Sequence, residues 1–107
     1  MSRYMAAFGF IIVKTITGNY FVGLNNKDYD NVIIGENRIW INNTMFPLSA
    51  IEYYKTKIPL MEFMRICRNA GIDNSNDVKE TLMDFYSSKE VNPKYIKYLR
   101  YMEGLRY

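Results

Sequence analysis

The side chains that could do chemistry in this chain are carboxylates, lysines, tyrosines and one cysteine. No histidine occurs among the 107 residues, which excludes a Ser-His or Cys-His nucleophile pair and the common histidine zinc sites. Cys67 lies among Phe63, Met64 and Ile66, where a small buried hydrophobic residue is expected, and a lone cysteine forms no internal disulfide. The glutamates fall in separate predicted elements, so no convergent carboxylate pair is indicated. We therefore expect no catalytic residues and no enzyme activity.

One segment, residues 73–84, begins like a calcium-binding loop. Its sixth position is Val78 where such loops need glycine, and its twelfth is Asp84 where they need a bidentate glutamate. The glycines are scattered and form no phosphate-binding cluster before a helix. We expect neither a metal nor another cofactor, and a capped turn between two helices at this position.

The C-terminal segment, residues 92–107, has the strongest pattern in the chain. Three residue classes recur there at every third position, so a helix would present an apolar row flanked by tyrosines and by a basic edge. The segment carries four basic and one acidic side chains. The apolar row could pack on the protein's own core, whereas the other two rows are candidates for partner binding: Lys94, Tyr95, Lys97, Tyr98, Arg100 and Tyr101.

A second candidate surface is centred on Trp40, which alternates with Arg38 on a predicted strand. A lone tryptophan usually lies in the core. The alternative is an exposed ring that stacks on a nucleic-acid base or fills a partner's pocket, because Trp, Tyr and Arg dominate interface hot spots. Tyr20 and Tyr29 would extend this surface if they share its face. The sequence leaves the two interpretations of Trp40 open.

The elements that must position these residues change type halfway along the chain. The first half is rich in β-branched and aromatic residues separated by turn signals, which predicts two hairpins. Pro47 lies in the segment 44–54, which fits either a fifth, edge-type strand or a short helix. The second half has apolar residues at helical spacing and predicts three helices, at about residues 59–70, 77–88 and 93–104.

Helix-terminal signals support these bounds. Pro59 suits a first helical position, and Gly71 followed by Ile72 predicts a Schellman ending of the first helix. Asp77 and Glu80 have the spacing of a capping box for the second helix. Strands followed by helices predict an α+β fold, and the length suits a single domain over residues 1–107.

The strand pattern of the first half carries a resemblance. The successive runs IIVKTITGNYFVGL, VIIGENRIWIN and MFPLSAIEYY resemble the strand succession of small SH3-like or Sm-like β-barrels. The resemblance covers less than half of the chain, at the level of the fold. It implies a small antiparallel sheet or barrel over about residues 6–54.

Composition bears on the class of protein. The uncharged apolar run at residues 4–13 is far shorter than the roughly 20 residues that span a bilayer, and no export signal is visible. We expect a protein of the host-cell cytoplasm without a membrane partner. Frequent Ile, Asn, Tyr and Lys, encoded by codons rich in A and T, are typical of genes of phages and other mobile elements.

These observations lead to one functional expectation and one alternative. We expect a non-enzymatic binding protein of phage or mobile-element type that occupies the surface of a host nucleic-acid-handling or defence complex, for example a CRISPR-type nuclease, and inhibits or redirects it. Such a protein would be an anti-CRISPR or similar inhibitor, with a host protein or protein–nucleic acid complex as its partner. The alternative is direct binding to RNA or single-stranded DNA. A homodimer is compatible with both.

Overall fold

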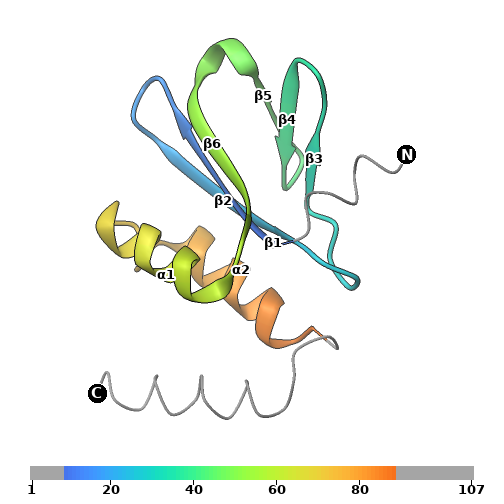
Figure 1. Ribbon diagram of the computed structural model, residues 1–107, viewed down its shortest axis with the longest axis vertical. Coiled ribbons are helices and arrows are strands. Elements are labelled where there is room, and N and C mark those ends of the chain that lie inside the picture. Colours follow the sequence, from blue (N-terminus) through green and yellow to red (C-terminus); the bar gives the residue numbers. More distant parts are fainter. Residues whose placement is uncertain (1–8, 89–107) are drawn as a thin grey trace.

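A computed structural model of the protein describes residues 9–88. Two three-stranded antiparallel sheets and two helices form three layers (Figure 1). The first sheet has the strand order β2-β1-β6, formed by Tyr20–Asn25, Gly9–Thr15 and Ile51–Ile58. The second has the order β3-β4-β5, formed by Val32–Ile34, Arg38–Ile41 and Thr44–Pro47. The helices are α1, Leu60–Asn69, and α2, Asn76–Tyr86.

Strand β1 lies in the middle layer and is buried on both faces. Phe10 and Ile12 point into a core shared with the helices, whereas Ile11 and Val13 point into a core shared with the second sheet. Successive side chains of a strand alternate between faces, so a strand covered on both sides needs apolar residues at consecutive positions. This explains the continuous apolar run at the start of β1.

The core between the first sheet and the helices is centred on an aromatic stack. The rings of Phe10 and Phe63 lie 4.2 Å apart between centroids and are nearly parallel, and both side chains are fully buried. Leu60, Phe63 and Cys67 recur at three- and four-residue spacing along α1, which turns one helix face to the sheet. Cys67 is buried, as its sequence context predicts.

The hairpin β4–β5 closes through a two-residue turn, as the Asn42-Asn43 pair predicts. Both residues have positive φ, 48° and 73°, which asparagine tolerates better than most residues. The register that follows pairs Ile41 with Thr44 and Trp40 with Met45. The turn therefore sets which side chains of β5 lie beside those of β4.

The segment 44–54 contains more structure than either sequence alternative. It forms β5, a short 3₁₀ turn at Leu48–Ala50, and the start of β6. Pro47 is the last residue of β5, which is an edge strand of the second sheet among residues 9–88. Its missing backbone N–H therefore leaves no further strand without a hydrogen bond. A strand and a turn of helix are thus both present, one after the other.

Of the predicted helix-terminal signals, the ending of α1 is confirmed, whereas Pro59 is the N-cap residue and α1 begins one residue later, at Leu60. Gly71 has φ 75°, and the Ile72 N–H donates to the Cys67 carbonyl at 3.0 Å, as in a Schellman ending. The predicted cap at Asp77 is wrong, because the Ser75 hydroxyl accepts the hydrogen bond of the Val78 N–H and α2 begins at Asn76. The mixed α+β class with antiparallel sheets is confirmed for residues 9–88. The third predicted helix, about 93–104, lies outside these residues, so two of the three predicted helices are described.

At Gly23 on β2 the two sheets pack closely against each other. A Cβ added there would lie 2.6 Å from a methyl carbon of Val32 and 3.3 Å from one of Ile41. We expect Gly23→Ala to lower the free energy of unfolding by about 1 to 3 kcal/mol through overpacking. Urea unfolding followed by circular dichroism measures this change. Gly35→Ala is the matched control, because its added Cβ meets only ordinary contacts, from 3.5 Å outwards, and equal losses in both variants would contradict the prediction.

Candidate binding surface

The outer face of the second sheet carries a row of exposed apolar side chains. Along β4 the side chains alternate, with Ile39 and Ile41 buried and Arg38 and Trp40 exposed. The register places Ile33 of β3 opposite Trp40, and Met45 of β5 opposite Trp40 on its other side. These three side chains are 45%, 38% and 42% exposed. We define the Trp40 face as Ile33, Arg38, Trp40 and Met45.

Two open hollows flank the Trp40 ring. The larger one, of about 560 Å³, lies at the β3–β4 turn and the smaller one, of about 200 Å³, at the β4–β5 turn. Ile33 and Trp40 border both. These two side chains therefore lie between the two depressions. The remaining lining residues are Ile34, Gly35, Glu36, Asn37 and Arg38 in the first, and Asp30, Asn31, Asn42 and Asn43 in the second.

The charges around this face nearly balance. Arg38 is exposed and has no ion-pair partner within 4.0 Å among residues 9–88. Glu36 and Asp30 are the acidic residues that line the two hollows. Arg38 together with Glu36 and Asp30 does not make a basic patch. The face therefore has an apolar centre, formed by the exposed row, and a polar rim.

The structure brings together two of the predicted binding residues, Arg38 and Trp40. The interpretation of Trp40 as a core residue is wrong, because its inward neighbours Ile39 and Ile41 fill the core and leave its own side chain on the outer face. Ile33 and Met45 complete the row and were not among the predicted residues. The place of Met45 could have been found from the two-residue Asn42-Asn43 turn, which sets the register of the β4–β5 hairpin.

Tyr20 does not share this face. It packs against the core between the first sheet and the helices, and Lys14 pairs with Tyr20 on one side and with Tyr53 on the other. The Lys14 ammonium lies 5.6 Å from the Tyr20 ring centroid and 3.4 Å from a Glu52 carboxylate oxygen. The pKa of Lys14 is raised, chiefly by the Glu52 charge, and burial raises the pKa of Tyr53. Tyr20 thus belongs to a cross-strand cluster on the side of the first sheet that the helices cover, and the Trp40 face lies on the second sheet.

Tyr29 is engaged within the fold. Its hydroxyl lies 2.8 Å from that of Ser87, and its ring packs against the core under α2. The neighbouring Asn26 amide donates to the Ser88 hydroxyl at 3.1 Å, so the loop between β2 and β3 is tied to the end of α2. Tyr29 holds this loop in place and does not join the Trp40 face.

The other predicted binding residues lie outside the described part of the chain. They are the two rows of the C-terminal segment: Lys94, Tyr95, Lys97, Tyr98, Arg100 and Tyr101. Their assignment to a partner stays a prediction.

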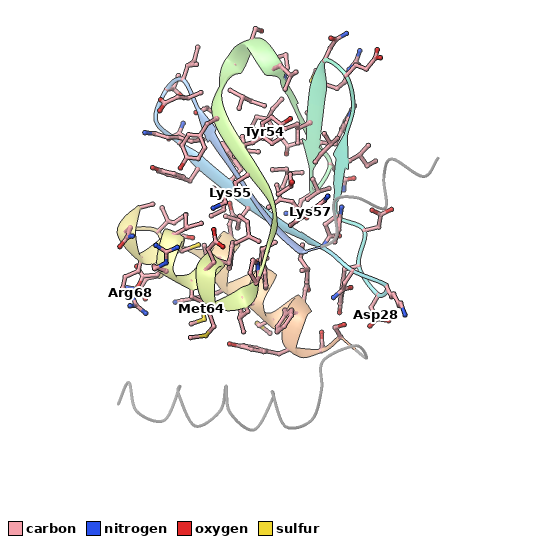
Figure 2. The ribbon with its side chains drawn as sticks, in the orientation of Figure 1. Asp28, Tyr54, Lys55, Lys57, Met64 and Arg68 are labelled. Atoms are coloured by element: carbon pink, nitrogen blue, oxygen red, sulfur yellow. The ribbon has the colours of Figure 1, made fainter. Side chains whose placement is uncertain are left out.

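The Cys67 thiol and the Lys55–Glu62 pair have roles in the packing of the fold. Burial raises the pKa of the Cys67 thiol to about 11, with a smaller contribution from Asp73, so a neutral thiol prevails at pH 7. The Lys55 ammonium, hydrogen-bonded to Glu62, lowers the pKa of that carboxyl and joins β6 to α1. Among residues 9–88, no group of three or more acidic or cysteine side chains is placed to hold a metal ion. Figure 2 shows Lys55 on β6 and Met64 and Arg68 on α1.

Within the same residues, no helix is long and apolar enough to cross a membrane. Comparison of the chain with protein-family models, with curated proteins and with solved structures found no match.

Proposed function

We propose that this protein acts by binding a partner protein through the Trp40 face. We further propose that the partner belongs to a host nucleic-acid-handling or defence complex, which the bound protein inhibits or redirects. The observation that carries the first proposal is the continuous exposed row of Ile33, Trp40 and Met45 across three strands. The composition typical of mobile elements is what supports the second.

An exposed apolar row with a polar rim is the usual anatomy of a protein interface. Extended contiguous apolar patches on the surface of a soluble protein commonly mark protein–protein interaction sites. Tryptophan and arginine are the residue types most enriched among interface hot spots, and Trp40 and Arg38 are two positions apart on one face of β4. The hollows on both sides of the ring offer space for side chains of a partner.

The charge on this face favours a protein over a nucleic acid. Binding to single strands combines aromatic stacking with a basic groove that follows the phosphates. Trp40 could supply the stacking, but Arg38 is accompanied by Glu36 and Asp30. Direct nucleic-acid binding is therefore the alternative, and it would draw its cations from Lys94, Lys97 and Arg100 in the C-terminal segment.

Two methionines allow a matched test of the Trp40 face. Met45 on β5 is 42% exposed within the face, and Met83 on α2 is 67% exposed in the helical layer. We expect Met45→Glu to abolish capture of the partner from a nuclease-treated host lysate, because a carboxylate would be buried in an apolar contact. Met83→Glu is expected to retain it. Quantitative mass spectrometry of the captured proteins compares both variants with the unaltered chain.

The outcomes separate the proposal from its alternative. The proposed interface would be supported by partner proteins that meet three conditions. They stay bound after nuclease treatment, their binding persists when the salt concentration is raised, and Met45→Glu loses them. Loss of all partners after nuclease treatment, with a steep linear dependence of log affinity on log salt, would favour nucleic acid. Equal capture by the Met45→Glu and Met83→Glu variants would show that the Trp40 face is not the binding surface. A captured nuclease complex should cleave more slowly when the full chain is added.

A further inference from the structure

The Trp40 face has a shape that restricts the kind of partner segment it can bind. Strand β4 is paired with β3 on one side and with β5 on the other, so its backbone hydrogen bonds are made within the sheet. The face therefore offers side chains and no free backbone groups of β4. An extended peptide lying on it would leave its own N–H and C=O groups without partners, at about 1 to 3 kcal/mol for each buried group. A helix satisfies its own backbone groups.

The spacing of the apolar row matches that of a helix. Neighbouring strands lie about 4.8 Å apart, so the row from Ile33 through Trp40 to Met45 spans about 9.6 Å. A helix rises 1.5 Å per residue, which places side chains at i, i+3 or i+4, and i+7 within about 10.5 Å. A helix crossing the strands can therefore set one apolar side chain beside each member of the row.

The two flanks of the row differ in charge. Arg38 lies toward the β3–β4 turn, and Asp30 lines the hollow at the β4–β5 turn. A helix above the row would place one polar flank near Arg38 and the other near Asp30. Because Arg38 has no ion-pair partner among residues 9–88, an acidic side chain on the first flank would gain a charge-assisted hydrogen bond.

We infer that the Trp40 face binds an amphipathic helix of the partner protein, with apolar residues at i, i+3 or i+4, and i+7 and an acidic residue facing Arg38. This inference rests on the proposed function, in which the same face binds a protein. A second copy of the chain fits less well. In a two-fold pairing centred on Trp40 the same residues would face one another, and the Trp40 face includes no acidic residue to pair with Arg38.

Two displayed peptide libraries test the helical partner. One has apolar residues at i, i+4 and i+7 and random residues elsewhere, and the other has apolar residues at alternate positions, as in a strand. Both are selected on the full chain, and clones are kept that bind the Met83→Glu variant and fail to bind Met45→Glu. We expect the retained clones to come from the helical library. The fluorescence of Trp40, the single tryptophan of the chain, should shift as each synthetic peptide binds.

Charge reversal then tests the orientation. Arg38→Glu should weaken the selected peptides about tenfold, and replacing their acidic residue by lysine should restore the affinity for this variant. Three results would overturn the helical partner. The retained clones could come mainly from the alternating library, or no clones could be retained. The unaltered chain could also form a dimer that Met45→Glu dissociates. If one of these results occurs while Met45→Glu still loses the lysate partner, the proposed function stands and only the inference fails.

Discussion

Replacing Phe63 by alanine is expected to lower the free energy of unfolding by about 3 to 5 kcal/mol. Phe63 is fully buried and stacks on Phe10, so its removal leaves a cavity between α1 and the first sheet. Domains of this size are stable by only about 5 to 15 kcal/mol, so the loss would remove a large share of the total stability. Urea unfolding followed by circular dichroism measures the change.

Met61→Ala is the control on the same helix. Met61 is 51% exposed, and we expect its replacement to change the free energy of unfolding by no more than about 0.5 kcal/mol. A loss below about 1 kcal/mol for Phe63→Ala would mean that the aromatic stack is not the centre of the core under the helices.

Replacing Trp40 by alanine is expected to weaken partner binding at least about 30-fold, the effect of a hot-spot residue at 2 kcal/mol or more. Trp40 is the central member of the exposed row and borders both hollows, so its removal takes away the apolar contact area at the middle of the face. Isothermal titration of the captured partner with the unaltered and altered chains measures the dissociation constants.

Tyr53→Ala serves as the matched aromatic control for binding. Tyr53 is 43% exposed, but it lies on β6 in the first sheet, away from the Trp40 face. Its replacement should leave the dissociation constant within about threefold of the unaltered value. Circular dichroism must show that both variants are folded. If Trp40→Ala and Tyr53→Ala weaken binding equally, the interface is not centred on Trp40.

The order of the elements and several of their ends can be predicted from the amino-acid sequence alone. The alternation in Arg38-Ile39-Trp40-Ile41 gives a strand because side chains of a strand change faces at each residue. Gly71 ends α1 and Asn42-Asn43 makes the tight turn, because these residues adopt positive φ at low cost. These signals are local, so they can be detected without knowing which elements pack together.

Which side of each strand faces water depends on how the elements pack together. Alternation places Trp40 opposite to Ile39, but it does not say which of the two faces the core. The answer depends on the packing of β4 against β1 and β2, where Ile39 and Ile41 meet Ile11 and Val13. The same packing separates Tyr20 and Tyr29 from Trp40, because they lie on the helical side of the first sheet. Burial is a property of elements distant in the chain, so only the folded arrangement could select Ile33, Arg38, Trp40 and Met45 as one surface.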